Sequence, residues 1–458
     1  MKIDFSQFAF ANRAFSEKPM TFCEPAHREM LASLIELVAL ETASHKALEQ
    51  WQAAQLRNLL FHVSQRSAFW RRRLPAKKNV RDLSLSSLPV LTRADVIAQV
   101  QSEGPLILRT DPLTTSKSST SGSSGTPVEF FVSDMNRRYN TARSLAQHFI
   151  EGRPLSLNRT KVKSGFIENK NGFTVAKDPS WTAGLDSFFK VGKGKYIEYA
   201  YPNIPKLLEE LTRDPIGYLV TIPHFIEFVI QYIEPADLKR AGADYWLCLG
   251  GSPDEQIRQK FADVGIIVRA SYSSEEVGPI GHECPMNPGH YHLAASNVIV
   301  ELDKSEGIII DGKLMGRVLI THLHSYATPF IRYDIGDLAQ LKDSCPCGHN
   351  GPVLSDIRGR SKLLLKHPDG HLIPFYVRAG KFIELVKLSG YRIRQTDLRT
   401  IVVEIERPDP LTSETIEALK NMVVAHSGPG FDIEVLHVEK IDWGKNTKQL
   451  GFKNEILS

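Results

Sequence analysis

The chain has 458 residues, of which 42% are hydrophobic and 24% charged, and its formal net charge is +4. This composition is that of an ordinary globular protein, the length predicts more than one domain, and the small net charge gives no reason to expect a nucleic-acid partner. No apolar run reaches the ~18 residues of a membrane span. The opening "MKIDFSQFAFANRAF" is too polar for a signal peptide. We therefore expect a cytoplasmic protein with neither nucleic acid nor membrane as partner.

Residues 25–75 are predicted to be helical, because apolar residues recur three and four positions apart with charges between them. From about 130 to 300 short apolar runs alternate with helical patterns. This alternation predicts an α/β fold with a largely parallel sheet, whose strands include 218–222, 245–251 and 266–272. Ligands bind at the carboxyl ends of such strands, so the loops after 251 and 272 are candidate sites.

Residues 297–337 are richer in strand patterns, and the character of the chain changes again after Arg360. Two strand-like runs and a helical run, 413–428, predict a small α+β module of about 100 residues. We predict a large multi-layer N-terminal domain over 1–361 and a small C-terminal domain over 362–458.

The stretch "SSTSGSSGTP" (118–127) is unusually rich in hydroxyl groups and glycine. Glycine lets backbone N–H groups turn inward and hydroxyl groups add donors, so such a loop can hold a polyphosphate. The alternative is a flexible Ser/Gly loop. It is not a GxxxxGK[ST] P-loop, because no lysine follows the second glycine.

Five motifs in order resemble those of the adenylate-forming (ANL) superfamily, and the resemblance as a whole covers roughly residues 50–458. They are "TSGSSGTP" (120–127), "LGGSP" (249–253), "SYSSEEVG" (271–278), "RYDIGD" (332–337) and "GRSKLLLK" (359–366). The segments "LLFHVSQRSAFWRRRL" and "PFIRYDIGD" are most similar in sequence to the phenylacetate–CoA ligase branch.

The resemblance implies an enzyme that uses ATP and Mg²⁺ to convert a carboxylic acid into an acyl-adenylate with release of pyrophosphate. In such a reaction the protein contributes mainly positioning and charge stabilisation. The family-matched nucleotide-binding residues are Thr120, Ser121, Gly122, Ser123, Ser124, Gly125, Thr126, Gly250, Gly251, Ser252, Tyr272, Ser273, Glu275, Asp337 and Arg360. Tyr272 would stack on adenine, Asp337 would accept the ribose hydroxyls, and Glu276 would hold Mg²⁺.

The sequence departs from the family pattern at two positions. Glu275 stands where the family usually has Thr or Ser, and Asp334 replaces the usual residue beside the Thr position in "RYDIGD". An extra carboxylate beside a triphosphate is unfavourable unless it faces away or joins the metal ligands. Both departures bear on nucleotide contacts and leave the reaction class unchanged.

The small domain is implied to be a lid that pivots at Lys362 and brings a catalytic lysine to the site during adenylation. Lys445, in a Gly-Lys pair, is the matched lysine, and Lys448 and Lys453 are its nearby rivals. Rotation of the lid would then expose the adenylate to its acceptor.

The cysteines suggest a metal site. Cys345 and Cys347 form "CPCGH", and Cys284 begins "CPMNPGHYH", with His290 and His292 downstream. A Cys₃His set is a structural zinc site, and related sets occur in the resembling branch. We prefer His292, which stands nine residues before Glu301 as in relatives, over His290. Three reduced thiols with chance histidines are the alternative.

The branch resemblance implies an aromatic acid, and His224 lies near a strand end where the family's substrate contacts are found. The acceptor stays open between the thiol of CoA, a carrier-protein thiol and an amine. An adenylating amide ligase, or a non-catalytic nucleotide-binding homologue, is the alternative function.

Overall fold

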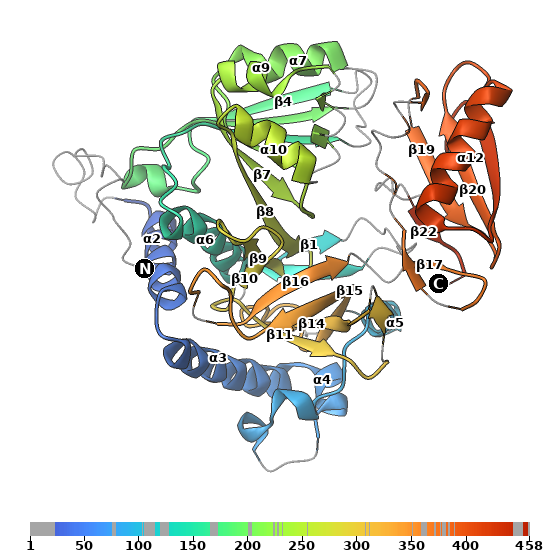
Figure 1. Cartoon of the computed structure of the whole chain (residues 1–458). Helices are drawn as coiled ribbons and strands as arrows, with labels where there is room; N and C mark the ends of the chain where they lie inside the picture. Colours follow the sequence, from blue (N-terminus) through green and yellow to red (C-terminus); the bar gives the residue numbers. More distant parts are fainter. Residues whose placement is uncertain are drawn as a thin grey trace.

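The computed structural model describes residues 23–456, apart from 76–78, 103, 105–114, 120–127, 165–172, 200–203, 223–224, 227–228, 231, 254, 307, 311, 350, 359–363, 371, 376, 378–381, 383–384, 389 and 443–451. Figure 1 shows a large α/β body and a smaller C-terminal unit at its side. The predicted fold class is confirmed. Among the described helices, none is long and apolar enough to cross a lipid bilayer.

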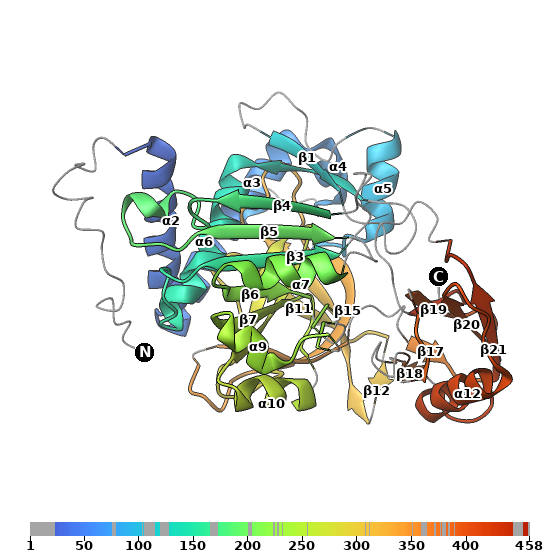
Figure 2. The ribbon, with the colours of Figure 1, turned by 90° about the horizontal axis from the view of Figure 1, so that it is seen from above.

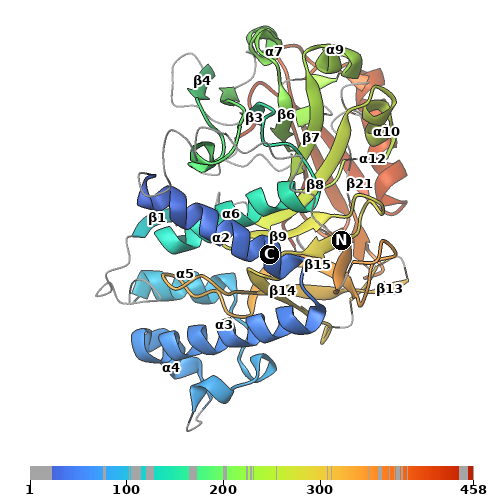
Figure 3. The same ribbon diagram turned by 90° about the vertical axis from the view of Figure 1, so that its left-hand side faces the viewer.

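The N-terminal region is helical as predicted, but with one interruption. It forms α2 (Pro25–Glu41), α3 (His45–Arg66) and α4 (Ala68–Arg73), which line one side of the body in Figure 3. The interruption falls at Ser67, whose extended backbone ends α3 and whose hydroxyl accepts from the N–H of Trp70 to cap α4. Trp70 is fully buried. The arginines that follow it donate to neighbouring groups of the chain: Arg73, for example, donates to the carbonyl of Val90 at 2.7 Å.

One sheet of 12 strands runs through the body, and its order is β11-β14-β15-β16-β10-β9-β8-β7-β6-β3-β5-β4. One half is parallel, as predicted: β3 (Arg159–Ser164), β5 (Gly194–Tyr199), β6 (Gly217–Thr221), β7 (Ala243–Leu249) and β8 (Ile267–Ser274). Helices accompany these strands in Figures 1 and 2: α7 (Ile204–Arg213), α9 (Pro235–Arg240) and α10 (Glu255–Asp263).

The other half is antiparallel, so the sheet as a whole is mixed rather than largely parallel. It contains β9 (Gly278–Glu283), β10 (Tyr291–Leu293), β11 (Val298–Asp303), β14 (Gly316–His322), β15 (Tyr333–Lys342) and β16 (Val353–Arg358). A tight turn joins β8 to β9, which reverses the chain and starts the antiparallel half. β4 (Phe173–Asp178) adds an antiparallel edge to the parallel half.

Smaller elements complete the body. They are η3 (Val80–Asp82), η4 (Leu85–Ser87), α5 (Arg93–Ser102), β1 (Thr115–Ser119), β2 (Glu129–Ser133), α6 (Asp134–Ile150), η5 (Leu185–Ser187), β12 (Ile309–Ile310) and β13 (Lys313–Leu314). α6 packs against α2 around a second apolar cluster of the body.

The C-terminal unit has its own core, which shares no residue with the clusters of the body. Its strands are β17 (Leu364–Lys366), β18 (Leu372–Pro374), β19 (Gly390–Gln395), β20 (Thr400–Glu406), β21 (Asp432–Val438) and β22 (Phe452–Asn454), and its helix is α12 (Ser413–Ser427). The core comprises residues between Leu365 and Phe452, whereas the main core of the body comprises residues between Leu59 and Leu354. β12 of the body contacts β18 (Figure 2).

Candidate functional site

The first element of the candidate site is the turn of residues 250–252, which follows β7. Gly250 has φ of +77°, a left-handed conformation that favours glycine. Its exposed backbone leaves room for a ligand, since a Cβ there would meet no atom within 4 Å. The hydroxyl of Ser252 donates to Glu283 at 3.0 Å and accepts from Arg258 at 2.8 Å, so these two side chains fix the position of the turn.

The second element joins two of the quoted motifs. Tyr272, at the carboxyl end of β8, donates its hydroxyl to Oδ2 of Asp337 on β15 at 2.7 Å. Burial, and then the charge of Asp337, raises the pKa of Tyr272 well above its usual value, so this hydroxyl keeps its proton. The register between β8 and β9 shifts between Tyr272 and Ser273, and such an irregularity turns side chains at a sheet edge.

The third element surrounds Glu276, which lies in the turn between β8 and β9. Tyr333 donates its hydroxyl to Oε1 of Glu276 at 3.2 Å, and Nη1 of Arg93 lies 3.9 Å from the same oxygen. Arg93 reaches this position because Leu91 pairs with Tyr333 in an isolated parallel bridge. The motifs that begin at 271 and 332 therefore contact each other.

A buried polar network supports this turn from the side of α6. A Cβ on Gly278, whose φ is +71°, would lie 2.6 Å from the side chain of Asn140. Nε2 of His322 lies 3.2 Å from the amide oxygen of Asn140, and Nδ1 lies 3.3 Å from the amide nitrogen of Asn136. These partners suit a neutral imidazole protonated at Nε2. Burial lowers the pKa of His322 to about 3, which keeps it neutral.

The two departures from the family pattern lie in different surroundings. Asp334 accepts from Arg317 at 2.9 Å and from the N–H of Gly336 at 2.8 Å, so its carboxylate is held within β14 and β15. Burial lowers the pKa of the half-buried Lys161 of β3, and the negative charge of the exposed Glu275 partly offsets this.

Several predicted residues lie outside the described part of the chain. Strands β1 and β2 pair in antiparallel register, from Thr115 with Ser133 to Ser119 with Glu129, and they flank the loop 120–127. The loop itself is not described, and neither are His224, Arg360, Lys362, Lys445 and Lys448. Lys453 on β22 is described, and its ammonium group lies 3.1 Å from Glu455.

Four of the predicted metal ligands lie together. The ligand atoms of Cys284, His292, Cys345 and Cys347, hereafter the Cys/His cluster, all lie within 4.8 Å of one another. β10 pairs with both β9 and β16, and this pairing brings the loops after β9 and after β15 to the same edge. His290 lies at the rim of the cluster, with Nδ1 3.6 Å from Cys345 Sγ and Nε2 3.0 Å from the ammonium group of Lys342.

A bound cation would offset the charge that the thiols of the cluster carry when they ionise. Burial, together with the neighbouring Cys345 thiol, raises the pKa of Cys347 to about 12. Burial also opposes ionisation of Cys284, but hydrogen bonds from Met286 and Asn287 lower its pKa overall. Three adjacent thiols cannot all ionise without a compensating charge, and a divalent cation supplies one. Burial, and then His349, lowers the pKa of His292 to about 4, so its imidazole is neutral, as a ligand must be.

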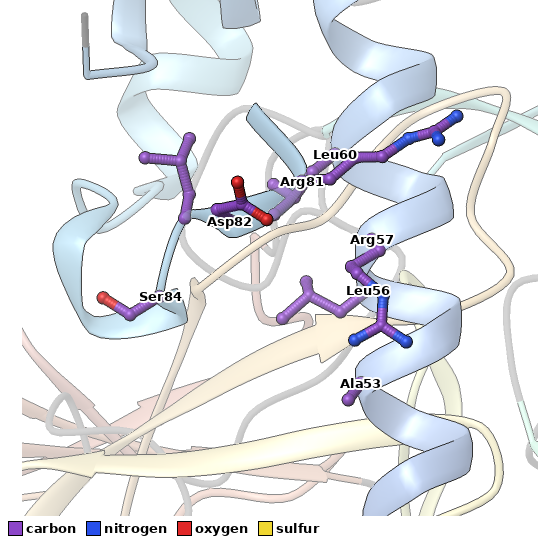
Figure 4. A pocket seen from close by; sticks show the side chains of 8 residues that line it. Ala53, Leu56, Arg57, Leu60, Arg81, Asp82 and Ser84 are labelled. Atoms are coloured by element: carbon purple, nitrogen blue, oxygen red, sulfur yellow. The ribbon is translucent and has the colours of Figure 1, made fainter. Parts of the chain in front are cut away.

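A separate surface pocket of about 380 Å³ lies between α3 and the segment of η3 and η4 (Figure 4). Its lining combines the apolar Leu56, Leu60 and Leu83 with the side chains of Arg57 and Arg81. It contains none of the motif residues.

The sequence motifs thus identified Tyr272, Glu276 and Asp337, and the structure brings these motifs into contact. Sequence reasoning missed the roles of Arg93, Arg258, Glu283 and the Asn–His network. Tyr333 was within a quoted motif, but the others carry no local pattern, because their partners lie far away in sequence.

No protein-family model and no curated protein matches the chain. Solved structures do. One is 2-hydroxyisobutyryl-CoA ligase in the postadenylation state with 2-HIB-AMP, at a TM-score of 0.62 and 16% identity over 91% of both chains. The same ligase with 2-HIB-AMP and CoA, in the thioesterification state, has a TM-score of 0.55 at 17% identity over 92% of both chains.

An acyl acid amido synthetase, GH3.15, has a TM-score of 0.51 at 13% identity over 90% of both chains. The two ligase structures hold the acyl-adenylate 2-HIB-AMP. At these identities the likeness concerns the fold, and it extends over nine-tenths of the chain. The chain therefore shares the fold of these ligase and amido synthetase structures.

Proposed function

We propose that this protein activates a carboxylic acid with ATP and transfers the acyl group to an acceptor, which we take to be the thiol of CoA. The observation that supports this most directly is that two distant motifs contact each other: Tyr272 donates to Asp337, and Tyr333 donates to Glu276. In this proposal, motifs separated by tens of residues would form one site.

The chemistry takes place in two steps. A carboxylate oxygen of the acid attacks the α-phosphorus of ATP, and the bond to pyrophosphate breaks. The acceptor thiolate then attacks the acyl carbon of the adenylate, and AMP leaves. In neither step does the protein need to form a covalent bond, so its task is to orient groups and stabilise charge.

In this proposal the backbone at Gly250 and Gly251 faces the adenine beside Tyr272, and Asp337 accepts from the ribose hydroxyls. The loop residues 120–126 would donate to the phosphates, and Arg360 would reach the ribose or a phosphate. Glu276 is the carboxylate that would hold Mg²⁺, which offsets phosphate charge.

We further propose that the Cys/His cluster holds a structural Zn²⁺. Four protein ligands leave no open position for substrate, as in structural zinc sites. The grouping of His292 with the three cysteines supports it as the fourth ligand, with His290 at the rim.

For the C-terminal unit we propose the role of a lid over 362–458 that pivots at Lys362 and supplies Lys445 to the adenylation step. Lys445→Ala should slow pyrophosphate release strongly, and Lys440→Ala, which removes another exposed lysine of the same unit, is the matched control. Equal rates in wild type and Lys445→Ala would contradict this role.

The substrate we propose is an aromatic acid, by resemblance to the phenylacetate–CoA ligase branch, with His224 near its carboxylate. ATP–pyrophosphate exchange over a panel of aromatic and aliphatic acids tests the whole proposal. Exchange that depends on one acid would establish adenylation and identify that acid as the substrate. We expect an aromatic acid to support exchange. Absence of exchange with every acid, in protein that binds ATP, would contradict the proposal.

An amide ligase is the second candidate, and the similarity to a solved acyl acid amido synthetase favours keeping it. Adding CoA, a carrier protein or a panel of amines to the acid that supports exchange separates these outcomes, because only the true acceptor yields acyl product and AMP. ATP binding without exchange would instead indicate a non-catalytic homologue.

A further inference from the structure

One carboxylate connects the Cys/His cluster to the candidate nucleotide site. Glu283 is the last residue of β9, and its side chain is only 1% exposed. It accepts two hydrogen bonds from Nη2 of Arg258, at 2.8 and 2.9 Å, and a third from the hydroxyl of Ser252 at 3.0 Å. Two backbone N–H groups complete the set: Ala270 at 3.1 Å and Gly289 at 3.0 Å.

These partners belong to two different parts of the site. Ser252 ends the 250–252 turn, whose glycines are the proposed adenine contacts. Gly289 lies in the loop between two members of the cluster, Cys284 and His292, and the N–H of Cys284 donates to the carbonyl of His290 at 2.7 Å. A change in that loop therefore acts directly on the carboxylate that holds the turn.

The arrangement is stiff because its members bind each other as well as Glu283. Arg258 donates to the hydroxyl of Ser252 at 2.8 Å and, through Nη1, to the carbonyl of Val268 at 3.3 Å. A buried carboxylate with charge-assisted partners keeps them fixed, since a lost partner would leave an unsatisfied buried charge.

We propose that Glu283 is a positioning residue through which the Cys/His cluster orders the 250–252 turn, so that ATP affinity depends on the cluster being intact. The inference rests on the proposed function, because it takes the turn to be part of the ATP site. It assigns the cluster a role in nucleotide binding beyond holding the fold together.

The test compares ATP binding to the full chain by isothermal titration calorimetry in wild type, Glu283→Gln, Cys347→Ser and the double variant. Glu41→Gln is the matched control. Glu41 is also buried, at 4% exposed, and accepts from Arg143 at 3.1 Å and from the hydroxyl of Ser296 at 2.6 Å, without contact to the turn.

We expect Glu283→Gln and Cys347→Ser each to weaken ATP binding about tenfold, which corresponds to ~1.4 kcal/mol. Glu41→Gln should leave the dissociation constant for ATP unchanged even if it lowers the melting temperature. If the cluster acts through Glu283, the double variant binds ATP no more weakly than Glu283→Gln does. In pyrophosphate exchange, KM for ATP should rise in Glu283→Gln while KM for the acid does not.

Unchanged ATP affinity in Glu283→Gln, or additive losses in the double variant, would overturn the inference. If Glu283→Gln does not fold, Arg258→Lys removes the guanidinium that joins Glu283 to Ser252. It should weaken ATP binding, and equal affinity would overturn the proposal. Wild-type protein that binds no ATP would instead refute the proposed function, so the two failures are distinguishable.

Discussion

The two halves of the large sheet contribute different kinds of group to the candidate site. From the parallel half come mostly backbone groups, at the 250–252 turn after β7. From the antiparallel half, and the turn that starts it, come charged or metal-binding side chains, such as Asp337, Glu276 and the Cys/His cluster.

The difference follows from how each half presents its chain. Parallel strands end at one edge, where glycine turns expose N–H and C=O groups to a ligand. Antiparallel strands bring residues from distant parts of the sequence face to face, so they can build pairs and clusters of side chains. Function in the antiparallel half should therefore be more sensitive to side-chain substitution.

The largest effect should come from breaking the Cys/His cluster. Cys347→Ser should reduce bound zinc from about one equivalent to near zero and cost several kcal/mol of stability, because the binding energy of a structural zinc contributes to folding. Metal analysis and thermal unfolding measure both. Cys248→Ala, at a buried thiol in β7 of the parallel half, should keep its zinc. Wild-type protein with less than about half an equivalent would contradict the zinc assignment.

Asp337→Asn should have the next largest effect. It keeps the shape but removes the charge that two ribose hydroxyls would use, so kcat/KM for ATP should fall about 100-fold, or ~2.7 kcal/mol. Asp334→Asn is the control within the same motif, since its carboxylate is bound to Arg317 and should not alter KM for ATP. Pyrophosphate exchange measures both variants. An equal loss of kcat/KM for ATP in Asp337→Asn and Asp334→Asn would refute the distinction.

Substitutions at Gly250 and Gly278 compare the backbone of the parallel half of the sheet with that of the antiparallel half. Both have positive φ, so alanine is strained at either position by ~1 kcal/mol. Only Gly278 also approaches a side chain, that of Asn140. Gly278→Ala should therefore lower the free energy of unfolding by ~2–3 kcal/mol in urea denaturation, against ~1 kcal/mol for Gly250→Ala. Similar losses would show that the contact with Asn140 relaxes without cost.

The smallest effect concerns pH. The pKa of His322 is about 3 in the folded protein, against about 6.5 when unfolded, so between these values the unfolded chain binds more protons. Stability is then lost as pH falls below 6.5, by up to ~1.4 kcal/mol per pH unit for this group. Urea denaturation at pH 7 and at pH 5 measures this loss. The free energy of unfolding should fall less from pH 7 to pH 5 in His322→Gln than in wild type. His426→Gln, on the exposed side of α12, should behave as wild type.

The sequence was sufficient to predict elements whose periodicity is local. Examples are α12, expected over 413–428, and β8, expected over 266–272. The parallel strands β3 and β5 were not singled out. The break at Ser67 was missed because the apolar pattern continues across it. The antiparallel half was recognised only as strand-rich, since the pairing of β10 with β16 depends on contacts between residues about 60 positions apart.

The same limit applies to the site. Tyr272, Glu276 and Asp337 stand in motifs, so they could be named, but the bond between Tyr272 and Asp337 spans 65 positions and was not foreseen. Arg258 and Glu283 lie in an ordinary amphipathic helix and at a strand end. Only the register of β8 and β9 brings them together, and no short pattern encodes that register.

The separate cores of the body and the C-terminal unit bear on how stability itself is measured. Residues around Leu365 and Phe452 pack among themselves, so the C-terminal unit can melt while the main core stays intact. We therefore expect that heating the chain gives a sum of two cooperative transitions rather than one all-or-none event. A single melting temperature would describe neither, and substitutions in the sheet should move only the transition of the body.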